Sequence, residues 1–213
     1  MAGLVVGEPL EHGAGELQAL ADTVLEGRLK SRRVDRQEDG DIRYWGVDPA
    51  QSHILRHLIV FSETWFSRQT GRPPALAFVM VNLVDAEKSP NGSGGGWHRD
   101  SLRPQYKGFV YLTDVLRESQ GAFAIIPASN SGVLKLASAA YRIASGGNRY
   151  SDGLVAAVQQ LGFRRRAVLL GSGIPFFADT SLIHRGLPIS EGQRVMATVY
   201  MFPNVPSAFS DLA

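Results

Sequence analysis

One stretch decides the predicted fold: GGGWHRD, residues Gly94 to Asp100. Strand side chains alternate between two faces, so His98 and Asp100 are expected to point to the same side. Imidazole nitrogen and carboxylate oxygen form a mixed ligand set. Such a set suits Fe(II) when a second histidine completes a facial triad that leaves coordination positions open. The stretch therefore predicts a metal site, provided that the chain supplies the second histidine.

The second histidine has few candidates, because the chain contains five in all: His12, His53, His57, His98 and His184. The first three precede every predicted barrel strand, and the helical pair among them lacks an accompanying acidic motif. His184 lies in the apolar run from Phe176 to Gly186, which we predict to be one strand. Ten residues later, Arg194 opens a second strand-like run that ends at Phe202.

These four residues, His98, Asp100, His184 and Arg194, resemble the site of the Fe(II)- and 2-oxoglutarate-dependent oxygenases. The surrounding sequence is similar to the phytanoyl-CoA dioxygenase family within that group. Three phrases carry the narrower similarity: WHRD at 97–100, YLTDV at 111–115 with GAFAIIP at 121–127, and ADTSLIH at 178–184 with the arginine beyond. The resemblance covers roughly the last two thirds of the chain.

The resemblance implies a set of roles. The triad would hold Fe(II), and the guanidinium of Arg194 would bind the far carboxylate of 2-oxoglutarate. Tyr111 matches an aromatic position that lines the 2-oxoglutarate site. Relatives often place Gly-Ser after the second histidine, whereas this chain has Arg185 and Gly186, so the serine contact is either missing or supplied elsewhere, by Thr198 or Thr180. With O2, such enzymes release succinate and CO2 and oxidise an unactivated C–H bond.

For four other polar residues the sequence allows either a ligand-binding role or a purely structural one. Lys107 shares a predicted strand face with Tyr111; it either binds a carboxylate or the substrate, or lies at a strand end with its amine in water. Asn82 interrupts an apolar strand, and either satisfies backbone groups, which we favour, or lines the co-substrate pocket. Arg142 and Arg149 are either substrate contacts or solvated side chains.

The order of elements predicts a mainly β fold. Strands follow one another from Ala75 to Phe202 without alternating helices, which is typical of a double-stranded β-helix, the jelly-roll or cupin-like barrel. Amphipathic helices predicted at 15–29 and 49–70 would buttress it. We expect one domain, 1–213, with a helical buttress (1–74) and a jelly-roll core (75–204). The core would carry an insertion (131–166) with a helix at 152–161. The charged run 30–41 is predicted to be a solvated loop or exposed edge, and 85–96 a flexible loop.

Composition narrows the functional classes. The 213 residues, 44% of them hydrophobic, suffice for one core, and a net charge of +2 argues against broad nucleic-acid binding. The chain has no cysteine, which excludes disulfides and thiolate metal sites. No stretch reaches the length of a membrane span, so a cytoplasmic location is expected.

The functional expectation is a dioxygenase that hydroxylates a polar or anionic small molecule, such as a natural product or sugar-like compound. Desaturation or ring formation would use the same cofactor. Two alternatives stay open: a cupin-like metal enzyme that does not use 2-oxoglutarate, and a jelly-roll binding module without catalysis. The position of Arg194 argues against the former and the complete triad against the latter.

Overall fold

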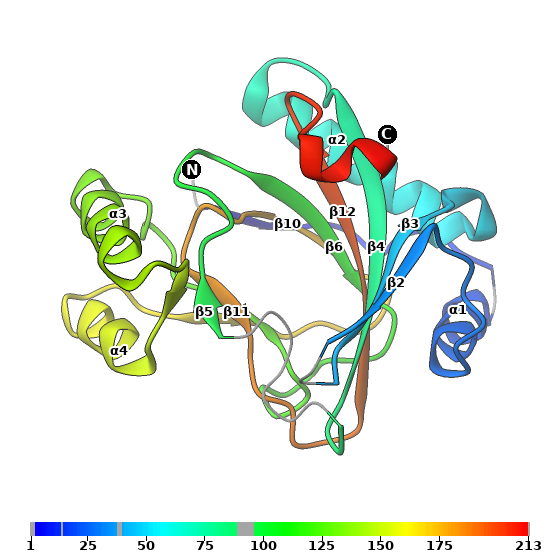
Figure 1. Cartoon of the computed structure of the whole chain (residues 1–213). Helices are drawn as coiled ribbons and strands as arrows, with labels where there is room; N and C mark the ends of the chain where they lie inside the picture. Colours follow the sequence, from blue (N-terminus) through cyan, green and yellow to red (C-terminus); the bar gives the residue numbers. More distant parts are fainter. Residues whose placement is uncertain (1–2, 14, 38–39, 89–95, 213) are drawn as a thin grey trace.

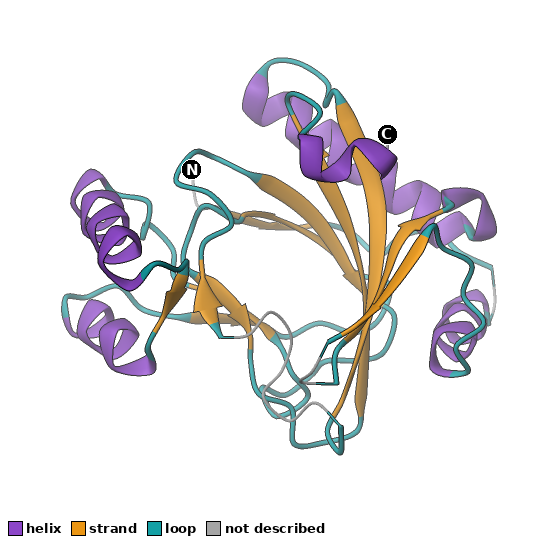
Figure 2. Ribbon diagram, in the orientation of Figure 1, coloured by secondary structure: helices purple, strands orange, loops and turns teal. Residues whose placement is uncertain are grey.

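The architecture is a pair of facing β-sheets with helices on the outside (Figure 1, Figure 2). It was obtained as a computed structural model, which describes residues 3–13, 15–37, 40–88 and 96–212. Within these residues the strands form two sheets whose pairings are all antiparallel. This arrangement confirms the predicted mainly β, jelly-roll fold.

The larger sheet has seven strands in the described part of the chain. Their order across the sheet is β1 (Leu4–Val6), β10 (Pro175–Asp179), β6 (Tyr106–Tyr111), β12 (Gln193–Phe202), β4 (Leu76–Asp85), β3 (Ile42–Val47) and β2 (Arg33–Arg36). Strands β4 and β12 pair along ten residues each, from Leu76 opposite Phe202 to Asp85 opposite Gln193. They form the centre of the molecule and are buried along most of their length.

The smaller sheet has five short strands among the described residues. Their order is β8 (Arg149–Tyr150), β5 (Trp97–His98), β11 (His184–Gly186), β7 (Phe123–Ile125) and β9 (Arg166–Val168). Strand β8 belongs to the predicted insertion, so the insertion adds an edge strand to this sheet. The insertion therefore contains part of the barrel.

Helices cover both sides of the barrel (Figure 1). Helices α1 (Glu16–Leu25) and α2 (His53–Thr70) lie outside the larger sheet, as predicted. Helices α3 (Gly132–Ser145) and α4 (Asp152–Gln160) lie beside the smaller sheet (Figure 1). Only α4 was expected within the insertion, and α3 was missed. Short 3-10 turns are η1 (Pro49–Gln51) and η2 (Ser207–Leu212).

Helix α2 begins later than predicted. Asp48 caps η1, and Ser52 then adopts an extended conformation, with its hydroxyl accepting a hydrogen bond from Ile54 N at 3.1 Å. The apolar face of α2 packs against β6, β10 and β12. Close approach is possible because β6 has Gly108 at the contact, where a Cβ atom would collide with Ser62 of the helix.

Two regions differ from the sequence-based prediction. Residues 1–74 contribute β1, β2 and β3 to the larger sheet in addition to helices, so Ala75 does not open the first strand. The run 176–186 is two strands in different sheets. A turn separates them because Asp179 Oδ1 accepts a hydrogen bond from Ser181 N at 2.9 Å, while Leu182 N donates to Asp179 O at 3.2 Å.

The structure describes only part of the two segments that were predicted to be loops, 30–41 and 85–96. The charged run 30–41 forms the exposed edge strand β2, and its residues 38 and 39 lie outside the described part of the chain. The predicted flexible loop 85–96 falls mainly on residues 89–95, which also lie outside the described residues. In the described ranges, no helix combines the length and the apolar character needed to cross a bilayer.

Candidate metal centre

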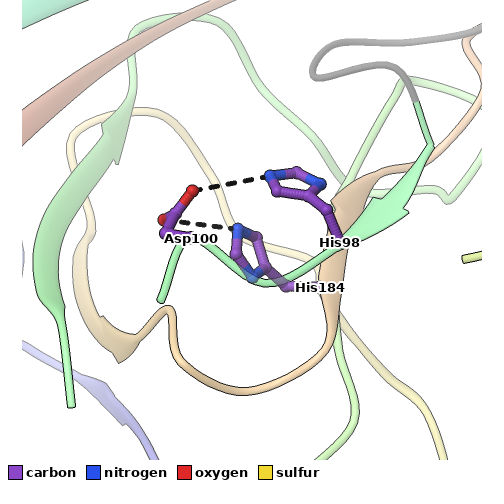
Figure 3. Close-up of side chains that lie close together, drawn as sticks. All are labelled: His98, Asp100 and His184. Carbon is purple, nitrogen blue, oxygen red and sulfur yellow. Dashed lines mark ion pairs between the residues drawn. The ribbon is translucent and has the colours of Figure 1, made fainter. Parts of the chain in front are cut away.

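The two histidines of the predicted triad are neighbours across two strands. His98 of β5 pairs directly with His184 of β11, and their ring centroids lie 4.3 Å apart. Asp100 follows β5 by two residues and turns its carboxylate toward both rings (Figure 3). Its Oδ1 lies 3.7 Å from His98 Nε2, and its Oδ2 lies 3.7 Å from His184 Nε2. Ligand atoms of the three residues lie within 4.8 Å of one another, so the group could hold a metal ion.

Backbone carbonyls fix the orientation of both imidazoles. His98 Nδ1 lies 2.9 Å from Gly96 O, and His184 Nδ1 lies 2.9 Å from Leu182 O. A carbonyl can only accept a hydrogen bond, so the geometry assigns the proton to Nδ1 and the lone pair to Nε2. Gly96 takes a φ of 93°, a conformation that favours glycine and lets its carbonyl reach the ring. Both Nε2 atoms are thus available as ligands.

The electrostatic environment favours neutral imidazoles and an ionised carboxylate. Burial lowers the pKa of His98 well below its ordinary value, and the nearby His184 lowers it further. Burial also lowers the pKa of His184, against the attraction of Asp100. Burial alone would raise the pKa of Asp100, but Lys107 and the two imidazoles bring it well below its ordinary value. These are the protonation states that a metal ion requires of its ligands.

Lys107 lies beside the triad. Its Nζ is 2.7 Å from Asp100 Oδ2 and 3.9 Å from the centroid of the Tyr200 ring, and the residue is buried. Burial opposes its charge, but Asp100 more than compensates and raises the pKa of Lys107 above its ordinary value. The lysine therefore neutralises the carboxylate in this structure. Neither predicted interpretation had included a contact with Asp100, the candidate metal ligand.

A cavity of about 180 Å³ lies between the sheets and is lined by all three triad residues. Its apolar wall includes Phe109 and Phe123. Its polar lining comes mainly from the larger sheet and the insertion: Asp41, Arg43, Asn82, Lys107, Asn148, Arg149, Thr198 and Tyr200. The predicted residues Asn82, Lys107 and Thr198 thus converge with the triad on one space.

Two buried polar atoms of uncharged side chains in this lining are unsatisfied. Asn82 Oδ1 and Thr198 Oγ1 have no hydrogen-bond partner among the residues that the structure describes. Asn82 Nδ2 donates to Asp41 Oδ1 at 3.2 Å, so this side chain bonds another side chain and lines the pocket; the favoured backbone role was wrong. A buried polar atom without a partner is costly, which indicates that a ligand or water meets these atoms.

Arg194 and Tyr111 lie behind the cavity lining. Arg194 faces the same side of β12 as Thr198 but is 1% exposed, and its Nη1 donates a hydrogen bond to Gly121 O. The Tyr111 hydroxyl accepts from Phe123 N at 2.7 Å and donates to Val168 O at 3.1 Å. Its ring supports the cavity wall through Phe176. Neither residue is among those that line the cavity.

The other residues predicted to contact the co-substrate or the substrate differ in whether they line the cavity. The Thr180 hydroxyl donates to Gln105 O at 3.1 Å and does not line the cavity, so Thr198 is the better placed of the two threonines. Arg149 of β8 pairs with His98 of β5 and lines the cavity. Arg142 of α3 is not among the lining residues.

Sequence reasoning missed the pair Asp41 and Arg43. Arg43 Nε and Nη2 lie 2.8 and 2.6 Å from Asp41 Oδ2, and Asp41 is completely buried. Arg43 is brought to the cavity because β3 pairs with β4, which places it directly opposite Asn82. The available signal was the run of apolar and aromatic residues around Arg43 in 42–47, which the adjacent charged run concealed.

Together, the fold and the site define a jelly-roll protein with a two-histidine, one-carboxylate cluster inside the barrel. No protein-family model and no curated protein matches the chain. The narrower similarity to the phytanoyl-CoA dioxygenase family therefore stays a prediction.

Solved structures do match over nearly the whole chain. The non-haem α-ketoglutarate-dependent epimerase SnoN from nogalamycin biosynthesis is 20% identical, with 99% of this chain and 83% of that chain covered and a TM-score of 0.63. HygX from Streptomyces hygroscopicus, with nickel, 2-oxoglutarate and hygromycin B bound, is 16% identical, with 94% and 83% covered and a TM-score of 0.55. A Pseudomonas putida prolyl-4-hydroxylase is 13% identical, with 96% and 95% covered and a TM-score of 0.60. At these identities the similarity shows that the chain shares their fold.

Proposed function

We propose that the protein is an Fe(II)- and 2-oxoglutarate-dependent dioxygenase. The observation that carries the proposal is the convergence of His98, Asp100 and His184 inside the jelly-roll cavity, with both Nε2 atoms facing the carboxylate. The same fold holds iron, α-ketoglutarate and nogalamycin RO in the epimerase SnoN. It also holds nickel, 2-oxoglutarate and hygromycin B in HygX.

The donor set fits Fe(II). Two neutral imidazoles and one carboxylate form the facial set typical of non-haem iron oxygenases, and three protein ligands leave positions for a chelating co-substrate and O2. Because each Nδ1 is hydrogen-bonded to a backbone carbonyl, both Nε2 lone pairs stay directed at the space beside the Asp100 carboxylate. When bound, iron would allow O2 to oxidise two partners: one oxygen atom converts 2-oxoglutarate to succinate and CO2, and the other oxidises a C–H bond of the substrate.

The chain offers groups for 2-oxoglutarate. Thr198 presents a buried hydroxyl to the cavity, and Arg194 lies on the same strand face with a guanidinium suited to a carboxylate. We propose that Arg194 receives the distal carboxylate and that Thr198 donates a hydrogen bond to it. Tyr111 would act on this subsite through its ring, since its hydroxyl is bonded to backbone groups.

The proposed substrate is a polar small molecule, natural-product-like or sugar-like. The lining is polar on both sides of the charge balance: Asp41 pairs with Arg43 and Asp100 with Lys107, while Arg149 adds a further cation. The unsatisfied Asn82 Oδ1 requires a hydrogen-bond donor. Hydroxylation is the proposed outcome. The same fold occurs in the epimerase SnoN and in the carbocyclase SnoK, so product analysis must distinguish the reactions. A cytoplasmic location and a single-domain organisation remain predictions.

Anaerobic titration of the protein with Fe(II) and 2-oxoglutarate tests this proposal. The chelate gives a weak visible charge-transfer band, which we expect in wild type, to be lost in His184→Ala and weakened in Arg194→Ala. His53→Ala, which changes an exposed histidine far from the cluster, should retain the band. Absence of the band despite bound iron would refute 2-oxoglutarate binding.

The same titration tests a second candidate, a cupin-like metal enzyme that does not use 2-oxoglutarate. One observation favours it: Arg194 bonds Gly121 O and lies outside the cavity lining. This candidate predicts iron binding that is unchanged by 2-oxoglutarate and insensitive to Arg194→Ala.

A further inference from the structure

The residue between two metal ligands, Arg99, is the largest completely buried side chain among the described residues. Its neighbours His98 and Asp100 line the cavity, whereas Arg99 does not, and its guanidinium instead contacts Ser129, Ser138 and Ser181. The proposed reaction assigns no role to this arginine. A buried guanidinium is costly unless its N–H groups are bonded, so its surroundings are informative.

The guanidinium of Arg99 joins separate segments behind the metal cluster. Nη1 donates to Ser181 O, in the turn that leads to His184, and Nη2 donates to Ser129 O, in the turn that follows β7. Nε donates to Ser138 Oγ of helix α3 at 3.0 Å. The side chain of Arg99 thus connects the segment that bears His98 and Asp100 with the segment that bears His184, and both with the insertion. We call this meeting point the junction.

Two further hydrogen bonds make this junction continuous with the ligands. Ser129 Oγ accepts from Ile183 N at 2.8 Å, immediately before His184. Asp100 N donates to Thr180 O at 3.1 Å, immediately before Ser181. A shift at Arg99 would therefore move both ligand-bearing segments relative to each other.

Arginine suits this position for a chemical reason. Its planar fork presents five N–H donors at fixed angles, so it can serve three acceptors at once, whereas a lysine ammonium is a compact charge on a flexible stem. All three acceptors are neutral, and no carboxylate bonds the guanidinium directly in the described part of the chain. Asp179 and Tyr150 also act electrostatically on the guanidinium, but the three hydrogen bonds to neutral acceptors are what fix its geometry.

We propose that Arg99 is a positioning residue for the metal centre: its bonds to Ser129 O and Ser181 O set the spacing between the His98–Asp100 segment and His184. The contact with Ser138 holds helix α3 on this junction but is not needed for ligand spacing. This inference rests on the metal site of the proposed function and concerns residues that do not touch the metal.

Co(II) is the probe for the test, because its visible d–d spectrum reports coordination geometry without turnover. The purified full chain is titrated with Co(II) after EDTA treatment, in wild type, R99K and S138A, and circular dichroism establishes folding. In R165K, a surface arginine paired with Glu118 is replaced with the same change of side chain, which makes it the matched control.

We expect R99K to bind Co(II) at least about tenfold more weakly and with an altered d–d spectrum, the size of effect seen when partners of metal ligands are removed. S138A should stay within about twofold of wild type, since that variant keeps both carbonyl contacts. It should show faster amide hydrogen exchange in α3. R165K should match wild type. If R99K is unfolded without metal, the Co(II) concentration that refolds it replaces the direct titration.

Each contrary result has a separate meaning. Failure of wild type to bind Co(II) would refute the metal site and with it the proposed function. Wild-type affinity and an unchanged spectrum in R99K would overturn the role of Arg99 alone. Weakening in S138A equal to that in R99K would also overturn it, because helix α3 rather than the carbonyl contacts would then set the spacing.

Discussion

Lys107 and Asp100 form an ion pair of 2.7 Å inside the cavity, on the same carboxylate that faces both histidines. A buried carboxylate that loses its partner costs roughly 3 kcal/mol or more. A bound divalent cation would supply an alternative positive charge at the same group. Lys107 therefore stabilises the metal-free protein more than it would stabilise the metal-bound protein.

We expect Lys107→Met to lower the unfolding free energy of the metal-free protein by about 3 kcal/mol. With saturating Zn(II), the loss should shrink to less than about 1 kcal/mol, because the metal replaces the ammonium as countercharge. Urea unfolding with EDTA and with Zn(II) measures both values, and Lys30→Met, at an exposed lysine, is the control. An equal loss in both conditions would contradict the explanation.

Thr198→Val should separate binding from stability. The Thr198 hydroxyl lacks a partner among the described residues, so its removal should leave the metal-free stability unchanged or slightly higher. Ligand binding should weaken, and we expect the 2-oxoglutarate Kd to rise about five- to tenfold, the value of one hydrogen bond. Calorimetry with Co(II) and 2-oxoglutarate measures this change.

Thr113→Val is the matched control for that variant. The Thr113 hydroxyl accepts a hydrogen bond from Val195 N at 3.0 Å, so its loss should cost about 1 kcal/mol of stability. Its effect on 2-oxoglutarate binding should be small. If Thr198→Val lost stability while Thr113→Val lost affinity for 2-oxoglutarate, Thr198 would not face the ligand.

Tyr111→Phe should chiefly affect stability. The hydroxyl bridges Phe123 N and Val168 O, and its removal leaves a buried N–H without a partner, which costs about 1–3 kcal/mol. Burial raises the pKa of Tyr111 to about 12, so the group stays protonated and donates throughout the working pH range. Thermal unfolding should show the loss, with a 2-oxoglutarate Kd near wild type. A large rise in Kd without loss of stability would place the hydroxyl on the co-substrate.

The metal-free protein should lose stability as the pH falls from 7 to 5. Burial lowers the pKa values of His98 and His184 in the folded state, whereas unfolded histidine titrates near about 6.5. Below that pH the unfolded chain binds more protons than the folded chain, so the unfolding free energy decreases. The depressed pKa of Asp100 acts only at lower pH, below the ordinary range of an unfolded aspartate.

Urea unfolding at several pH values, in the presence of EDTA, measures this dependence. His184→Gln removes one of the two groups and should flatten the curve between pH 7 and 5. A wild-type curve without slope in this interval would contradict the assignment of neutral, buried histidines.

The triad was predictable because its strongest signal is local. His98 and Asp100 are separated by one residue, and the scarcity of histidines left His184 as the partner. The placement of these ligands side by side depends on the pairing of β5 with β11, which agrees with the jelly-roll expectation.

What the sequence did not reveal depends on pairing between distant segments. Strand β2 reads as a charged loop, because three of its four residues are ionisable and it lies at the sheet edge. Arg43 reaches the cavity only because β3 pairs with β4. Lys107 was recognised as a candidate, yet its contact with Asp100 follows from the packing of one sheet over the other, which local periodicity does not encode.

Strand β8 has a practical consequence for redesign of selectivity. The insertion looks like an interchangeable module, and exchange of 131–166 between proteins of this fold is an obvious way to alter what the barrel accepts. Yet Arg149 and Tyr150 provide the hydrogen-bonding neighbour of Trp97 and His98. A graft that omits this dipeptide would leave the strand that carries His98 as an open edge. The exchangeable units are therefore the two flanking helices, with the dipeptide retained as part of the scaffold.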